Sequence, residues 1–189
     1  MFDTIFPTFI YYHDNLITQF EEKVEGYKQF INKIASVWGT SRTEDSPPSL
    51  HRTNPNLHKY KEFEELCEAI LQHANLASVK AGYKFKKLRI VNMWANVSQE
   101  GDVLFPHVHP GTLFSGAFYL CSPPKCILTI KRNDSFFIEP NIINDVSATE
   151  KYYECLPNRL ILFRSDTWHC VKKQGPGEKI VVSFNILPE

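Results

Sequence analysis

Two histidines lie two residues apart in the stretch "FPHVHPG", just before a run of strand-forming residues. In an extended segment, residues two apart point to the same face, so His107 and His109 would share one face with Cα atoms about 6.7 Å apart. Two imidazoles at this spacing can bind one metal ion. Pro106 and Pro110 flank the pair and stiffen its backbone. The pattern is short, however, so a surface turn carrying two histidines also fits it.

Two further residues favour the metal site. His169 lies in "FRSDTWHCV", at the boundary between two apolar runs, and Lys179 begins the last apolar run. On an extended strand Lys179 shares a face with Val181, Ser183 and Asn185. A lysine on the inner face of a core strand requires an anionic partner. The alternative is that Lys179, which follows the turn-forming stretch "GPGE", lies at an exposed strand end.

The elements that must position these residues change type near residue 85. Apolar residues spaced by three or four predict helices over residues 14–38 and about 57–79. The segment 39–56 between them is rich in proline and turn-forming residues and predicts a loop. After residue 85, short runs rich in β-branched and aromatic residues predict strands. Many short strands joined by loops favour a sandwich or a jelly roll.

We therefore predict an α+β fold in which N-terminal helices cover a β core of the sandwich or jelly-roll type. One domain would span residues 1–189, with a mainly helical cover over about 1–85 and the core with its metal site over about 86–189. In the first core strand, residues 87–97, strict alternation predicts one face made of Leu88, Ile90, Asn92, Trp94 and Asn96.

The composition excludes several classes of protein. Hydrophobic residues make up 43% of the 189 residues and the formal net charge is zero, so we expect a packed core and no general nucleic-acid binding. No apolar run is long enough to span a membrane, and the N-terminus lacks the features of a signal peptide. The five cysteines are odd in number and have no CxxC spacing. These features predict a reduced, cytoplasmic protein without a membrane partner.

The segments around the histidines, together with "FSGAFYL", "LILFRSDTWH" and "EKIVVSFNI", resemble the 2-oxoglutarate/iron(II) oxygenase family. This family belongs to the double-stranded β-helix group that includes prolyl hydroxylases. The resemblance is good from about residue 87 to 188 and loose over the helical half. It implies a dioxygenase that needs Fe(II), 2-oxoglutarate and O2, and that hydroxylates a protein side chain or a small molecule.

Carried over residue by residue, the resemblance assigns His107 and His169 to the two histidines of the iron triad H-x-D/E…H. It assigns Lys179 to the basic residue that binds the far carboxylate of 2-oxoglutarate. The chain departs from the pattern at His109, where the triad has a carboxylate, and at Lys179, where the group usually has arginine. His109 is then either a third neutral ligand or a neighbour of the coordination sphere. Lysine keeps the charge but loses the bidentate fork of arginine.

Three more residues are predicted to line the co-substrate site. Ser183 would supply a hydroxyl from the strand of Lys179, and Asn92 would donate a hydrogen bond to the carboxylate nearest the metal. Tyr119 shares a face with Ser115 and Ala117, and either reaches the cavity or packs in the core. Trp94 has the same two alternatives.

Two other functions fit the same residues. A 2-oxoglutarate-independent dioxygenase of the cupin type with three histidine ligands is favoured by His109 and disfavoured by Lys179. A jelly-roll binding module without enzymatic activity is the other, because the fold hosts many functions. The segments 39–56 and 139–154 are candidate lids over the cleft. The sequence leaves open the substrate and the oligomeric state, with a homodimer among the alternatives.

Overall fold

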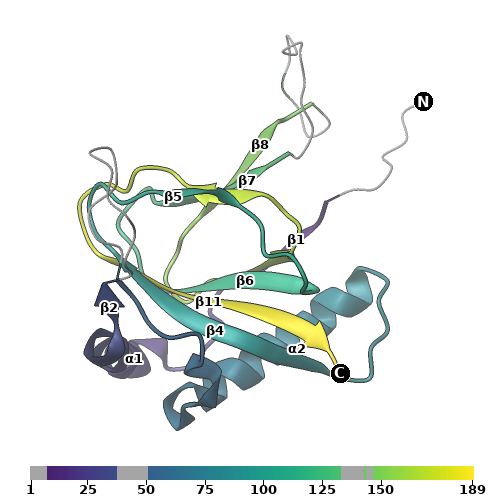
Figure 1. Ribbon diagram of the computed structural model, residues 1–189, viewed down its shortest axis with the longest axis horizontal. Helices are drawn as coiled ribbons and strands as arrows, with labels where there is room; N and C mark the ends of the chain where they lie inside the picture. Colours follow the sequence, from purple (N-terminus) through teal and green to yellow (C-terminus); the bar gives the residue numbers. More distant parts are fainter. Residues whose placement is uncertain (1–7, 38–50, 133–142, 144–146) are drawn as a thin grey trace.

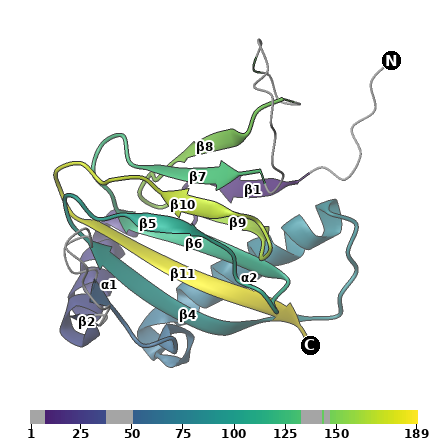
Figure 2. The same ribbon diagram turned by 45° about the horizontal axis from the view of Figure 1, so that its top comes forward.

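The structure, a computed structural model, describes residues 8–37, 51–132, 143 and 147–189. Two sheets lie face to face, and two helices cover the outer face of the larger one (Figure 1). Figure 2, in which the molecule is turned by 45°, shows the smaller sheet above the larger sheet and the helices below it. The predicted α+β class and the jelly-roll core are confirmed.

The larger sheet has the strand order β1-β9-β6-β11-β4-β3-β2, and all neighbouring strands are antiparallel. Its strands are β1 (Ile10–His13), β2 (Ser36–Val37), β3 (His51–Arg52), β4 (Leu88–Ser98), β6 (Phe114–Cys121), β9 (Leu160–Arg164) and β11 (Lys179–Pro188). The smaller antiparallel sheet has the order β5-β10-β7-β8. Its strands are β5 (Leu104–His107), β7 (Ile127–Lys131), β8 (Glu150–Glu154) and β10 (His169–Val171). From β4 to β11 the chain crosses repeatedly between the two sheets, as in a jelly roll.

Both predicted helices are present, with shorter bounds than the sequence pattern suggests. They are α1 (Phe20–Ile34) and α2 (Glu64–Lys80), and two short 3₁₀ turns, η1 (Leu57–Lys59) and η2 (Lys61–Phe63), precede α2. The residues before α1 are held by other contacts. The backbone N–H of Ile17 donates to Asn158 Oδ1 at 2.9 Å, and Asp14 pairs with Arg159. These tertiary bonds keep this segment out of the helix. Neither helix in the described part of the chain is long and apolar enough to cross a membrane.

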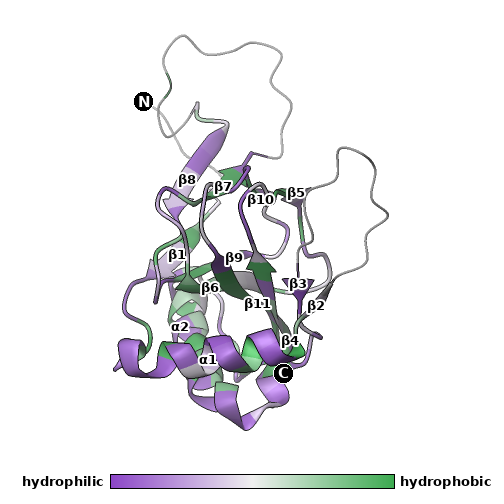
Figure 3. Ribbon diagram, turned by 90° about the vertical axis from the view of Figure 1, so that its left-hand side faces the viewer, coloured by the Kyte–Doolittle hydropathy of each residue, from purple (hydrophilic) through white to green (hydrophobic). Residues whose placement is uncertain are grey.

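The larger sheet carries apolar residues on both faces. One hydrophobic cluster fills the space between this sheet and the helices, and includes Tyr27, Ile31, Phe63, Ile70, Phe118 and Phe184. A second, smaller cluster lies between the two sheets and includes Tyr119, Leu128, Phe163 and Val181. Figure 3 shows hydrophobic residues along β6, β9 and β11, and hydrophilic residues on β8 and on much of α1. The space between the sheets is therefore the place where a buried site can form.

Strand β4 departs from strict alternation at Val91. Asn185 of β11 pairs with Asn92, but the next residue, Ile186, pairs with Ile90, so Val91 is an extra residue. Such a bulge reverses the faces of the residues on either side of it. The helix-facing cluster accordingly contains Leu88, Ile90, Met93, Ala95 and Val97. The predicted common face of Leu88, Ile90, Asn92, Trp94 and Asn96 is wrong, because only the last three face the smaller sheet.

The predicted lids lie partly outside the described residues, at 39–50, 139–142 and 144–146. Residues 51–56 of the first segment are described. They include β3, which pairs with β4 in the larger sheet, and Arg52 and Pro55 line the cavity between the sheets. Of the second segment, β8 is the edge strand of the smaller sheet, so this part is not a loop.

Two glycines give a matched test of this packing. A Cβ atom added at Gly116 in β6 would clash with the ring of Phe184 and lie 2.7 Å from the carbonyl oxygen of Ile161. We expect Gly116→Ala to lower the free energy of unfolding by about 1–3 kcal/mol. Gly26 lies within α1 with nothing near its added Cβ, so Gly26→Ala should raise it by about 0.5–1 kcal/mol. Urea unfolding curves measure both. Equal midpoints for Gly116→Ala and the wild type would contradict the close approach of β6 and β11.

Candidate metal centre

A cavity of about 690 Å³ lies between the two sheets. Its floor is the ladder of β4 and β11, from the pair Lys179 and Ser98 at one end to the pair Asn185 and Asn92 at the other. The smaller sheet contributes the opposite wall through β5 and β10. Polar side chains thus face one another across a space whose surroundings are largely apolar.

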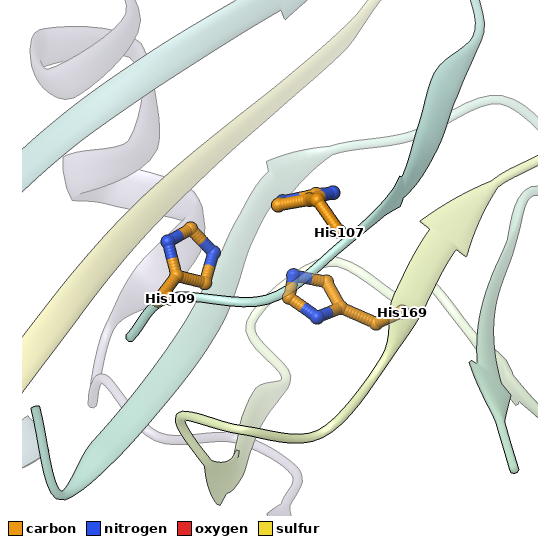
Figure 4. A group of neighbouring side chains, drawn as sticks. All are labelled: His107, His109 and His169. Carbon is orange, nitrogen blue, oxygen red and sulfur yellow. The ribbon is translucent and has the colours of Figure 1, made fainter. Parts of the chain in front are cut away.

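The structure brings the three predicted histidines together at this cavity. His107 ends β5 and His169 begins β10, and the two residues are directly paired across these strands. His109 lies in the following turn, where its backbone N–H donates to the carbonyl of Ser165 at 2.8 Å. One ring nitrogen of each histidine lies within 4.8 Å of the others. Figure 4 shows the three rings around a common space.

Two of the rings are oriented by backbone carbonyls. His107 Nδ1 lies 2.8 Å from the carbonyl oxygen of Phe105, and His169 Nδ1 lies 2.9 Å from that of Thr167. A carbonyl only accepts, so each Nδ1 carries the hydrogen and donates it. The Nε2 atom of each ring is then left with a free lone pair. Metal-binding histidines in proteins are held in this way.

The protonation state of the cluster also suits a metal. Burial, together with the neighbouring His107, lowers the pKa of His169 to about 3, although the hydrogen bond to the carbonyl of Thr167 raises it. Burial lowers the pKa of His109 to about 4, with smaller contributions from His107 and Arg52. Both rings are therefore neutral at pH 7, and the neutral imidazole is the form that binds a metal.

The donor set fits a transition metal. The three imidazoles form a metal-ligand cluster without a carboxylate or thiolate among the described residues. Imidazole suits Fe, Zn, Cu and Ni ions, and nitrogens bound about 2.1 Å from one ion lie at most about 4.2 Å apart. The spacing of 4.8 Å or less is close to this limit, so small ring rotations suffice to bind an ion.

Lys179 is buried at the start of β11 and lines the same cavity, with 6% of its surface exposed. The alternative of an exposed strand end is therefore wrong. Val181, Ser183 and Asn185 line the cavity too, which confirms the predicted common face. None of the ion pairs within the described residues includes Lys179. A buried ammonium group that faces a cavity is suited to binding an anion.

The other predicted residues also line this cavity. Asn185 accepts a hydrogen bond from Ser115 Oγ at 2.5 Å and donates one to Asn92 Oδ1 at 2.7 Å. This chain fixes the amide of Asn92, so that its Nδ2 group is left to donate. Tyr119 lies in the cavity wall but is only 2% exposed, so it also packs in the core.

Arg52 was not found from the sequence, because it lies in a segment predicted to be a loop. It belongs to β3, and its guanidinium lies 4.5 Å from the ring centre of Trp94. The Trp94 ring is in turn 5.7 Å from that of His109. Trp94 therefore lines the cavity beside the histidines instead of packing only in the core. A cation stacked on an indole is held at a defined position, which here is the wall next to His109.

Comparison with known proteins agrees with this geometry. Residues 92–185 match the family described as "Putative 2OG-Fe(II) oxygenase". No curated protein matches the chain. A prolyl-4-hydroxylase from Pseudomonas putida is similar in structure, with a TM-score of 0.66, 10% identity, and coverage of 95% of this chain and 92% of that one.

Two other solved structures are similar to a comparable degree. A viral collagen prolyl hydroxylase from Paramecium Bursaria Chlorella virus-1 has a TM-score of 0.64 at 11% identity, covering 95% of this chain and 96% of its own. HygX from Streptomyces hygroscopicus has a TM-score of 0.66 at 13% identity, covering 96% and 83%. At these identities the structures show a shared fold.

The fold and the site define a double-stranded β-helix protein with a three-histidine cluster. The family match begins at Asn92 and ends at Asn185, and so includes all three histidines and Lys179. The chain belongs to the 2OG-Fe(II) oxygenases.

The lowered pKa values predict a pH dependence of the metal-free protein. Below pH 6.5 the unfolded chain protonates its histidines, whereas His169 and His109 stay neutral in the folded state until about pH 3 and pH 4. The unfolded state then binds more protons, so the free energy of unfolding falls as the pH is lowered through this window. We expect His169→Asn to reduce this slope relative to the wild type, with the exposed His13→Asn as control. Chemical unfolding between pH 7 and pH 4.5 with a chelator measures the slope, and identical slopes would contradict the burial of a neutral His169.

Proposed function

We propose that His107, His109 and His169 hold one Fe(II) ion through their free ring nitrogens, and that 2-oxoglutarate lies in the cavity with its far carboxylate against Lys179. The observation that carries this proposal is that the histidine cluster and a buried lysine without a described ion-pair partner line the same cavity. Both features lie inside the segment that matches the oxygenase family. The reaction would then use O2 and a prime substrate.

When bound, iron(II) supplies the chemistry of the family, in which O2 oxidises 2-oxoglutarate to succinate and CO2 and a C–H bond of the substrate is hydroxylated. The residues of the chain provide position, charge and exclusion of water. Lys179 would neutralise the far carboxylate, and Ser183 and Tyr119 line the same cavity. The apolar side chains of Leu128, Phe163 and Val181, which line the same cavity, keep this space dry.

The neutral ligand set has a consequence for the order of binding. Three imidazoles leave the charge of an Fe(II) ion uncompensated, whereas a site with one carboxylate would neutralise part of it. The 2-oxoglutarate dianion would supply the missing negative charge at the metal and meet the positive charge of Lys179. Iron and co-substrate are therefore expected to bind cooperatively, each raising the affinity for the other.

The prime substrate would enter at the end of the cavity next to His109. Here the wall is made by Arg52, Trp94 and Asn92, which offer a cation, an aromatic face and an amide donor. The similar structures include a collagen prolyl hydroxylase and HygX with hygromycin B bound. The substrate proposal therefore remains a protein side chain or a small molecule.

A single titration separates the candidate functions. We expect anaerobic addition of Fe(II) and then 2-oxoglutarate to give a weak visible charge-transfer band that His107→Ala abolishes. The exposed His13→Ala variant is the matched control, because His13 lies outside the cavity. Iron binding without the band would favour the 2-oxoglutarate-independent three-histidine dioxygenase, the function that His109 supports. No iron binding would leave only the non-enzymatic binding module.

The role of Lys179 has its own test. A charge-assisted hydrogen bond contributes about 1.5–3 kcal/mol, so Lys179→Met should raise KM for 2-oxoglutarate roughly tenfold to a hundredfold. Lys179→Arg, which keeps the charge, should restore most of the affinity. Fe(II) binding should be unchanged in both variants, as should KM in Lys172→Met, since Lys172 is exposed and pairs with Glu150. Succinate production measures KM. A KM for Lys179→Met equal to that of the wild type would remove the proposed carboxylate site.

A further inference from the structure

Two cysteines face each other where the β7–β8 ladder ends. The last pair of this ladder is Ile127 with Glu154, and one position further the N–H of Cys155 donates to the carbonyl of Cys126 at 3.0 Å. Cys126 and Cys155 therefore occupy opposite positions just beyond the ends of two antiparallel strands. Both side chains belong to the hydrophobic cluster between the sheets, which also contains Tyr119.

Their placement meets the requirements of a disulfide. Facing residues of antiparallel strands have Cα atoms about 4.5–5.5 Å apart, and disulfides bridge Cα atoms about 4.4–6.8 Å apart. The other cysteines have different neighbours: Cys121 pairs with Ile180, Cys170 pairs with Thr129, and Cys67 lies 3.7 Å from the sulfur of Met93. All five thiols are free in the structure. Of the described cysteines, this pair is the one placed to be joined.

The two thiols also differ in acidity. A hydrogen bond from Cys155 lowers the pKa of Cys126, and the positive charge of Lys179 lowers it further. The same hydrogen bond raises the pKa of Cys155, as does its burial. The shared proton therefore stays on Cys155 and negative charge develops on Cys126, the arrangement of an attacking or oxidisable thiol with its resolving partner.

Cys126 is the more accessible cysteine of the pair, since Cys155 is only 3% exposed. Cys126 retains 9% exposure and lines a second cavity of about 320 Å³. The same cavity is lined by Lys125, Lys172 and Lys173, which make its wall positively charged.

We propose that Cys126 and Cys155 are a peroxide-sensitive pair that closes to a disulfide beside the Lys179 end of the main cavity. The Cys126 thiolate attacks one oxygen of hydrogen peroxide, the O–O bond breaks, and the leaving hydroxide takes up a proton to form water. Cys155 then attacks the sulfur of the resulting sulfenic acid. The S–S bond forms, the S–O bond breaks, and the hydroxide leaves with the proton of Cys155 as a second water.

The disulfide would change the co-substrate site, a consequence that rests on the proposed function. In the reduced state Cys155 packs in the same cluster as Tyr119, which lines the main cavity, and the charge of Lys179 lowers the pKa of both thiols. Oxidation would replace the thiol packed in the cluster of Tyr119 by a disulfide and would remove the negative charge near Lys179. A carboxylate bound at Lys179 would in turn disfavour the Cys126 thiolate, so 2-oxoglutarate should slow the oxidation severalfold.

The first test concerns the modification alone and uses the reduced, metal-free full-length chain. Stoichiometric hydrogen peroxide should reduce the thiol count under denaturing conditions from the five of the sequence by two, and peptide mapping should find Cys126 joined to Cys155. Cys155→Ser should leave Cys126 as a sulfenic acid that a dimedone probe captures. Cys121→Ser should form the disulfide at the wild-type rate. Unchanged thiols, or a disulfide between other cysteines, would overturn the proposal.

The second test asks whether disulfide formation depends on 2-oxoglutarate bound at Lys179. Oxidation is repeated with an inert divalent metal and 2-oxoglutarate, and with succinate as a shorter control acid. Slower closure with 2-oxoglutarate in the wild type, and no such effect in Lys179→Met, supports the coupling. Disulfide formation at one rate in all conditions overturns the coupling to Lys179 and leaves the modification site standing. Failure of iron or co-substrate binding in the separate charge-transfer titration would bear on the proposed function alone.

Discussion

The pairing of β5 with β10 is the interaction on which the site depends. It places His107 directly opposite His169, although these residues are far apart in the sequence. The turn after β5 then brings His109 back to the same space, held by its bond to the carbonyl of Ser165. Two strand ends and one turn thus hold three imidazoles at one point, and the carbonyls of Phe105 and Thr167 set the orientation of two of them. A loss of register between these two short strands would separate the ligands even if every side chain were kept.

The charge balance of the cavity depends on the side chains that line it once β5 has paired with β10. The cluster consists of three imidazole rings without a described carboxylate, and the buried ammonium of Lys179 lines the same cavity. Arg52 contributes a further positive charge next to Trp94. A cavity of this kind, with a metal added, attracts an anionic ligand more strongly than a triad with its own carboxylate would. In the free protein, the charge of Lys179 also lowers the pKa of the Cys126 thiol.

The larger sheet has a different function on each of its two faces. β4, β11 and β6 pack against the helices on one face and line the cavity on the other. The bulge at Val91 allows both, because it turns Leu88 and Ile90 to the helices and Asn92 and Trp94 to the cavity on a single strand. Without this extra residue, either the apolar or the polar half of β4 would face the wrong layer.

Local patterns in the sequence determine the fold class and most of the residues of the candidate site. The helical stripes, the alternating runs after residue 85 and the HxH pair predicted the fold class, the three histidines and the cavity face of Lys179, Val181, Ser183 and Asn185. Backbone periodicity and side-chain direction act over a few residues, so they can be read from neighbouring letters.

The bulge in β4, the contact of Arg52 with Trp94, the pairing of Asp14 with Arg159 and the facing cysteines were decided only by the tertiary structure. Each of these depends on which strand lies beside which, and in what register. That choice is made by packing and hydrogen bonding between distant segments, so no local pattern records it.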